Sequence, residues 1–208
     1  MKKLFFCKNC IVFSTRPRIT FNSKGICSAC QWSHEKKKIN WGNRKKELKE
    51  LIKLCKLKKS NYDCIVPVSG GKDGSYVAYN LKHKHKMKVL TVTVRPPLET
   101  QIGQENLNSF INSGFNHLHI TPDTEAMRAL NKIGFEKMGF PYYGWLISIH
   151  TVIAKLAVQM KIPAIFYSED GEVEYGGDTK YKNKSVYGID YQISHYLEGG
   201  YKKIIDFA

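Results

Sequence analysis

From residue 61 onward, short apolar runs alternate with segments of helical periodicity, and this alternation constrains the fold more than any other feature of the chain. Short apolar strands separated by helices are typical of a parallel sheet with helices on both faces, in which ligands bind at the carboxyl ends of the strands. We therefore expect an α/β fold. The expected strands are 63–69, 88–94, 117–121 and 163–169, and the expected helices are 73–85, 102–114, 123–139 and 145–160.

The turn after the first strand carries the first chemical signal, Ser69-Gly70-Gly71-Lys72-Asp73-Gly74-Ser75. Glycines let a backbone turn tightly and bring its N–H groups close to phosphate oxygens, and the helix that follows presents its positive end to the same anion. Lys72 adds a mobile cation. The loop lacks the GxxxxGK[ST] spacing of a Walker motif. We interpret it as a phosphate-binding loop, with a glycine-rich turn that holds no ligand as the alternative.

Four of the six cysteines lie before residue 35, in two CxxC pairs separated by 16 residues. That spacing is typical of a four-cysteine zinc site, in which two tight turns supply four thiolates to one tetrahedral ion. A closed sphere of four thiolates leaves no position for water, so the zinc would be structural. An iron–sulfur cluster, disulfides and free thiols remain alternatives. The expected ligands are Cys7, Cys10, Cys27 and Cys30, while Cys55 and Cys64 are expected to be buried apolar residues.

The chain of 208 residues has 33 basic and 18 acidic residues, which gives a formal net charge of +15. Such a charge favours an anionic partner but does not choose among RNA, nucleotides and acidic metabolites. Only five of the basic residues are arginine, so a lysine-biased proteome would produce the same surface. Residues 36–59 are lysine-rich and carry leucines at spacings of three and four, which predicts an amphipathic helix.

A loop rich in carboxylates follows the fourth expected strand. In a protein this basic, acid concentrated at a ligand-binding edge is a candidate for holding Mg²⁺ or contacting sugar hydroxyls. A solvated acidic turn is the alternative. The candidate substrate- or magnesium-binding residues are Glu169, Asp170, Glu172, Glu174, Tyr175, Gly176 and Gly177.

The loop sequence VPVSGGKDGSYVAY resembles the pyrophosphate loop of the PP-loop ATPase superfamily, whose usual form is SGGxDS. The resemblance implies a sheet of the adenine-nucleotide α-hydrolase type, ATP and Mg²⁺ as cofactors, and AMP and pyrophosphate as products. It implies catalytic roles for Lys72 and Asp73, the latter as a candidate magnesium ligand. The ATP-binding residues it implies are Ser69, Gly70, Gly71, Lys72, Asp73, Gly74 and Ser75, with Thr93, Val94 and Arg95 at the end of the second strand.

A narrower resemblance joins the cysteine pairs, Asn40-Trp41, the glycine loop and the motif GEVEYGG at 171–177 in one order. Together they resemble the N-acetyl sugar amidotransferase family, whose members are longer, so this chain is expected to be a short or truncated member. The resemblance implies a carbon–nitrogen ligase that converts an acetamido group of a bacterial nonulosonic acid into an acetamidino group, for flagellin glycosylation or lipopolysaccharide biosynthesis. The expected domains are a zinc ribbon at 1–35, a basic linker helix at 36–60 and a PP-loop ATP-binding domain at 61–208.

The nitrogen source is expected to be free ammonia or a separate glutaminase subunit, because no cysteine stands in a context suited to glutamine hydrolysis. The main alternative function is a tRNA-thiolating PP-loop enzyme. Against it, no cysteine follows Cys64 to carry sulfur beside the nucleotide. A non-catalytic RNA-binding ribbon is a further alternative, although aromatic residues do not interleave with the basic helix. We expect a cytoplasmic enzyme with an N-acetylated sugar substrate, and neither a nucleic-acid partner nor a membrane partner.

Overall fold

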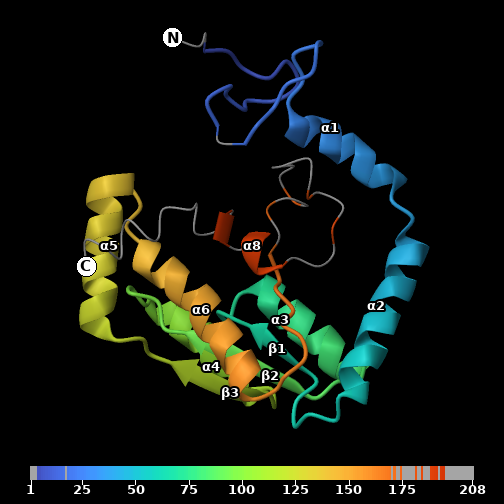
Figure 1. The fold of residues 1–208 in the computed structure, drawn as a ribbon, viewed down its shortest axis with the longest axis vertical. Helices are drawn as coiled ribbons and strands as arrows, with labels where there is room; N and C mark the ends of the chain where they lie inside the picture. Colours follow the sequence, from blue (N-terminus) through green and yellow to red (C-terminus); the bar gives the residue numbers. More distant parts are fainter. Residues whose placement is uncertain are drawn as a thin grey trace. The chain divides into compact units, whose positions relative to one another are not determined.

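The fold was obtained as a computed structural model that describes residues 4–16 and 18–169, together with 171, 174, 181, 184, 188–191 and 193–194. The chain divides into two compact units (Figure 1). One, which we call the ribbon unit, comprises Met1–Leu48 and Glu169–Val186. The other, the sheet unit, comprises Lys49–Ser168 and Tyr187–Ala208. Among the described residues, no helix combines the length and the apolarity that crossing a bilayer requires.

The ribbon unit begins with two short antiparallel contacts, Phe6 with Phe13 and Phe21 with Cys27. A short helix follows. The sequence pattern does not predict it, because its eight residues are too few to establish a periodicity. Its N-cap is Cys27, whose sulfur accepts a hydrogen bond from the N–H of Cys30. The helical elements are α1 (Ser28–Glu35), the 3₁₀ turn η1 (Lys36–Lys38) and α2 (Trp41–Leu57), which continues into the sheet unit.

The sheet unit contains three parallel strands in the order β1-β2-β3. They are β1 (Cys64–Pro67), β2 (Val89–Val94) and β3 (Asn116–Ile120). In this register Ile65 pairs with Leu90, and Leu90 pairs with Asn116. All six residues of β2 are buried, as expected for a central strand of a sheet covered on both faces.

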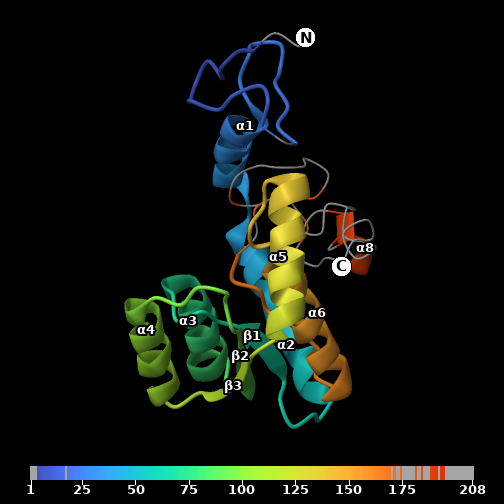
Figure 2. The same ribbon diagram turned by 90° about the vertical axis from the view of Figure 1, so that its left-hand side faces the viewer.

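Helices cover both faces of this sheet, with α3 and α4 on one side and α6, with α5 packed against it, on the other (Figure 2). Side chains cap two of them: Thr100 accepts from the N–H of Gly103 at the start of α4, and Asp123 accepts from that of Ala126 at the start of α5. The helices are α3 (Lys72–Tyr79), the π turn η2 (Asn80–Lys84), α4 (Gln101–Asn112), α5 (Thr124–Met138), α6 (Tyr143–Gln159) and α8 (Ile189–Tyr191).

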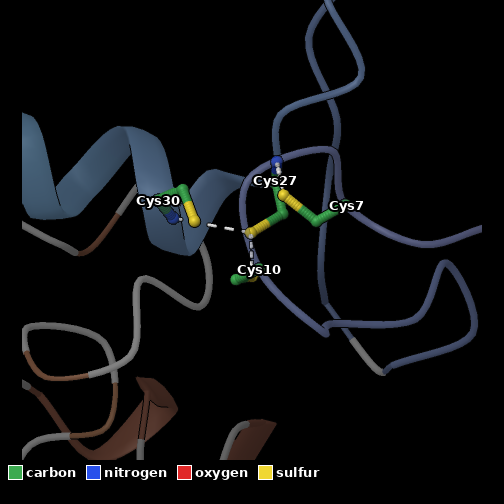
Figure 3. Close-up of side chains that lie close together, drawn as sticks. All are labelled: Cys7, Cys10, Cys27 and Cys30. Atoms are coloured by element: carbon green, nitrogen blue, oxygen red, sulfur yellow. Dashed lines mark hydrogen bonds between the residues drawn. The ribbon is translucent and has the colours of Figure 1, made fainter.

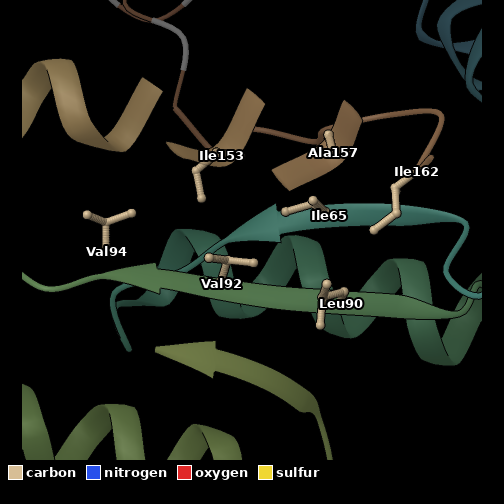
Figure 4. Close-up of a cluster of buried hydrophobic side chains, with 7 residues drawn as sticks. All are labelled: Ile65, Leu90, Val92, Val94, Ile153, Ala157 and Ile162. Carbon is tan, nitrogen blue, oxygen red and sulfur yellow. The ribbon is translucent and has the colours of Figure 1, made fainter. Parts of the chain in front are cut away.

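The core of the sheet unit lies between the sheet and α6 (Figure 4). Ile153 and Ala157 project from the helix onto Ile65, Leu90 and the valines of β2. This packing explains why residues 145–160 are almost continuously apolar. The buried cluster consists of Ile65, Leu90, Val92, Val94, Ile153, Ala157 and Ile162.

The predicted fold class, α/β with a parallel sheet and a four-cysteine module at the N-terminus, is confirmed. The fourth expected strand is reduced to one parallel bridge between Ile65 and Ile165. The N–H of Ile65 donates to the carbonyl of Ala164 and its carbonyl accepts from the N–H of Phe166, so β1 has this segment on one side and β2 on the other. Pro67, which lacks an N–H donor, is the last residue of β1.

Candidate functional site

The glycine loop begins where β1 is fastened to the neighbouring strand. The N–H of Val68 donates to the carbonyl of Val92 at 2.9 Å, and the Thr93 hydroxyl donates to the carbonyl of Val68 at 2.6 Å. Thr93 is buried, so this hydroxyl is shielded from water and its bond is held firmly. The structure thus brings Thr93, predicted at the end of β2, directly against the base of the loop.

Gly70 lets the loop pass against the backbone of α4. Its φ is +81°, a conformation that L side chains rarely adopt. A Cβ added there would lie 2.6 Å from the backbone nitrogen of Leu107 and 2.8 Å from its Cα. Because backbone atoms cannot give way as a flexible side chain can, both the conformation and the space at this position require glycine.

The loop leads into α3 with the N-terminus of that helix lacking a side-chain cap. Gly71 is the N-cap residue and makes no side-chain hydrogen bond to the first turn. The backbone N–H groups of a helix's first turn have no intrahelical acceptors, and the helix dipole makes this end positive. Lys72 and Asp73 stand at the same end, with the Lys72 Nζ 2.7 Å from both carboxylate oxygens of Asp73. This exposed arrangement can receive an anion.

Gly74 stands where the usual SGGxDS pattern has serine, and the packing around it explains the difference. A Cβ at Gly74 would lie 3.1 Å from the carbonyl oxygen of Pro67 and 3.2 Å from the Cα of Val68. The helix therefore approaches the end of β1 more closely than most side chains permit. The hydroxyl of Ser75 donates to the carbonyl of Gly71 at 2.7 Å, so its proton is used within the helix.

The other predicted ATP-binding residues lie at the carboxyl end of β2. Val94 is buried, and its carbonyl accepts a hydrogen bond from the Trp145 indole N–H at 3.2 Å. Arg95 is exposed and pairs with Glu99 at 2.8 Å. The sequence does not predict this contact of Trp145, because no local pattern indicates which aromatic residue of an apolar helix reaches the end of a strand.

The acidic motif is only partly described. Glu169 and Glu174 are both exposed and belong to the ribbon unit rather than to the sheet unit. The carbonyl of Glu174 accepts a hydrogen bond from Lys36 at 3.4 Å within the ribbon unit. The role of the acidic motif in binding substrate or Mg²⁺ at the ligand-binding edge stays a prediction. The candidates outside the described residues are Asp170, Glu172, Tyr175, Gly176 and Gly177.

The four predicted metal ligands come together in the ribbon unit (Figure 3). Their sulfurs all lie within 4.8 Å of one another, and none of the four is in a disulfide. The sulfurs of Cys10 and Cys27 are 3.7 Å apart. Tetrahedral zinc with Zn–S bonds of about 2.3 Å separates its sulfurs by about 3.8 Å, so this spacing fits a zinc–thiolate centre.

The electrostatics of the cluster also fit a bound cation. Burial raises the pKa of Cys7, but the N–H groups of Cys27, Asn9 and Cys10 outweigh it and lower that pKa to about 6. Burial and the neighbouring cysteine sulfurs together raise the pKa of Cys27 to about 12, although the N–H of Cys30 acts to lower it. Four thiolates this close repel one another unless a cation lies between them. The donor set therefore suits Zn²⁺ with Cys7, Cys10, Cys27 and Cys30 as ligands.

The two remaining cysteines are buried in the sheet unit, as predicted. Burial raises the pKa of Cys64 to about 12 and also raises that of Cys55. Both therefore stay protonated thiols at neutral pH and are poor nucleophiles.

No protein-family model matches the chain, and no curated protein matches it significantly in sequence. Among solved structures, it is similar to an NH3-dependent NAD synthetase from Campylobacter jejuni in complex with the nitrate ion. The TM-score is 0.49 and the sequence identity 14%, over 81% of this chain and 78% of that one. Likeness at this level leaves the chemistry to be argued from the chain's own residues.

Proposed function

We propose that the loop 69–75 binds the phosphates of ATP and that the chain is an ATP-dependent ligase that adenylates a carbonyl oxygen. The observation that carries this proposal is the junction of β1 and α3. There, a glycine held at positive φ precedes a helix N-terminus without a side-chain cap, and a lysine stands in its first turn. Backbone donors, the helix dipole and a lysine thus belong to one helix N-terminus at the carboxyl edge of a parallel sheet.

The proposed reaction has two steps, and the first uses ATP. The oxygen of an acetamido group attacks the α-phosphorus, so an oxygen–phosphorus bond forms while the bond to the departing pyrophosphate breaks. The amide nitrogen releases its proton, and the product is an imidate ester of AMP. This step converts a poor leaving group, the amide oxygen, into a good one.

In the second step ammonia attacks the activated carbon. A carbon–nitrogen bond forms, the carbon–oxygen bond to AMP breaks, and ammonia loses a proton. The product is an acetamidino group. Ammonia or a separate glutaminase subunit supplies the nitrogen, since Cys55 and Cys64 are buried, protonated thiols unsuited to hydrolysing glutamine.

The chain's own contribution is electrostatic. The backbone N–H groups at the start of α3 and the Lys72 ammonium would stabilise the negative charge that develops on the leaving pyrophosphate. The Asp73 carboxylate accepts two hydrogen bonds from the Lys72 ammonium. When nucleotide binds, Asp73 would exchange Lys72 for a metal ion. A magnesium ion at this carboxylate would neutralise phosphate charge. The zinc centre of the ribbon unit would be structural, because four cysteines leave it no open position.

We further propose that the substrate is an N-acetylated bacterial sugar of the nonulosonic acid type. This rests on the resemblance carried by the cysteine pairs, Asn40-Trp41, the glycine loop and the motif at 171–177. Such a product would enter flagellin or lipopolysaccharide glycans. A tRNA substrate remains the second candidate because of the net charge of +15.

The test is release of AMP and pyrophosphate from ATP with ammonium present, with N-acetylated nonulosonic acids in one arm and bulk tRNA in the other. We expect AMP release that depends on the sugar, and a loss of about a hundredfold or more in Asp73→Ala. Gly70→Ala should abolish ATP binding, measured by calorimetry, since its Cβ would meet the backbone of α4.

Gly139→Ala is the matched control. Gly139 also has a positive φ, +68°, but its Cβ would meet nothing within 4 Å. This variant carries the backbone strain without the clash, so its ATP affinity should equal that of the parent chain. AMP release with tRNA alone would mean that the substrate is tRNA rather than a sugar. Unchanged ATP binding in Gly70→Ala would overturn the assignment of the loop as the ATP-binding site.

A further inference from the structure

The end of β2 carries a backbone carbonyl that lies beyond the paired part of the sheet. Neighbouring residues of a strand direct their polar backbone groups to opposite sides, and the N–H of Arg95 donates to the carbonyl of Ile120 on β3 at 2.8 Å. The polar groups of Val94 therefore face the other side, toward β1. Among the described residues, the last backbone bond that reaches β2 from that side runs from the N–H of Val68 to the carbonyl of Val92.

Trp145 holds the carbonyl of Val94 from the side of α6. Its indole N–H donates to this oxygen at 3.2 Å, and Val94 itself is buried. A carbonyl oxygen has two lone pairs, so it can accept a second hydrogen bond while the first is kept. The indole therefore fixes the direction of the carbonyl and leaves it able to accept from a ligand.

The first turn of α6, which carries Trp145, is in turn fixed against α5. The Oδ1 of Asn131 accepts from the N–H of Gly144 at 2.9 Å and from that of Trp145 at 3.3 Å. A Cβ added at Gly144 would lie 2.7 Å from the Cβ of Leu130, so the two helices approach closely at this point. The indole is thus attached to a backbone position that α5 holds in place.

We propose that Trp145 is a positioning residue that makes the nucleotide site select a base with an amino group. This inference rests on the proposed function, because it requires the phosphates of ATP at the loop 69–75. The hydroxyl of Thr93 donates to the carbonyl of Val68 at 2.6 Å, so the residue after Thr93, which is Val94, lies close to the base of that loop.

The chemistry of the two partners gives the selection its direction. The amino group of adenine can donate to the carbonyl of Val94, in the direction that Trp145 fixes. A base with an oxygen at the same position, such as hypoxanthine, would bring two acceptors against each other and leave the Val94 carbonyl without a donor from the base.

A purely structural Trp145 would behave differently. If the indole only packed α6 onto the sheet, its loss would disturb β2 and, through Thr93, the phosphate loop as well. Binding of phosphates and selection of the base would then weaken together. Inorganic tripolyphosphate, which has the phosphates but no base, separates the two roles.

The test is a set of dissociation constants, measured by calorimetry on the zinc-loaded full chain with Mg²⁺, for ATP, inosine triphosphate and inorganic tripolyphosphate. The parent chain should bind ATP about tenfold more tightly than inosine triphosphate. Trp145→Phe keeps an aromatic ring but lacks the N–H, so it should reduce that ratio about fivefold and leave the affinity for tripolyphosphate unchanged. ATP, but not tripolyphosphate, should also change the tryptophan emission of the parent chain, and Trp145→Phe should lose this change.

Tyr142→Phe is the matched control. It too removes one polar hydrogen from an aromatic side chain at the start of α6, where Tyr142 is 41% exposed, and all three of its dissociation constants should equal those of the parent. An unchanged ratio of ATP to inosine triphosphate affinity in Trp145→Phe, or an equal weakening of tripolyphosphate binding, would overturn this inference and leave the proposed ATP site standing. A parent chain that binds neither ATP nor tripolyphosphate would overturn the proposed function, and this inference with it.

Discussion

The two units of this chain reach a stable fold by different means. In the sheet unit, seven buried apolar residues from β1, β2, α6 and the segment after it form one continuous core. In the described part of residues 4–48, Trp32 is the one large apolar side chain that is buried, while Phe5, Phe6, Phe13 and Ile11 stay exposed. The difference teaches that apolar content alone does not make a core. The ribbon has apolar residues but too short a chain to surround them, and bonds from the four cysteine sulfurs to a metal ion would take the place of packing.

Removing the metal should have the largest effect on stability, and it should distinguish the two units because only the ribbon is expected to unfold. Structural zinc contributes about 10 kcal/mol or more to small domains at neutral pH, so chelation or Cys27→Ser should unfold the ribbon. The amide spectrum of residues 4–35 should collapse while that of the sheet is retained. Cys55→Ser is the control, since Cys55 is buried but lies outside the cluster. A ribbon spectrum that survives without metal would contradict the comparison.

Truncating a core side chain of the sheet unit should have the second largest effect on stability, and this effect should fall on the sheet unit rather than on the ribbon. Ile153 is 1% exposed and packs between α6 and the sheet, so Ile153→Ala should lower the free energy of unfolding by about 3 kcal/mol. Urea unfolding followed by circular dichroism measures this, and bound zinc should not change. Val158→Ala, on the same helix but 78% exposed, should alter the unfolding free energy by less than about 0.5 kcal/mol.

Local signals made much of this architecture predictable. The cysteine spacing determines which side chains can meet around one ion, and the alternation of strands and helices leaves few topologies open. The glycine loop follows a strand and precedes a helix, as its sequence indicates. Each of these inferences depends on residues close together in the chain, where geometry is limited by backbone chemistry.

Contacts between distant residues could not be predicted in this way. The indole N–H of Trp145 on α6 donates to the carbonyl of Val94 at the end of β2, and Gly70 lies against the backbone of Leu107. Residues 163–169 have the composition of a strand, yet they make one bridge, because pairing depends on the neighbouring strand as well as on propensity. The exposure of Phe5, Phe6 and Phe13 also depends on how little of the chain surrounds them.

Replacing His117 should have a smaller effect, on the pH dependence of stability. This effect sharpens the comparison because His117 belongs to the sheet unit. Burial, and then the charge of His119, lower the pKa of His117, whose Nδ1 lies 3.0 Å from the Thr91 hydroxyl. The unfolded chain then binds a proton more readily than the folded one, so stability is present above the ordinary histidine pKa of about 6.5 and is lost as pH falls through the lowered value.

His117→Asn should therefore flatten the fall in unfolding free energy on acidification below about pH 6.5. Comparing this variant with the parent chain at each pH cancels any acid-induced loss of zinc, because both carry the same cysteines. His150, whose pKa burial also lowers, should account for part of the slope that remains. An identical pH dependence in the two proteins would mean that the half-buried ring on β3 takes up its proton as easily folded as unfolded. The sheet unit's response to acid would then have to arise at His150 or at its carboxylates.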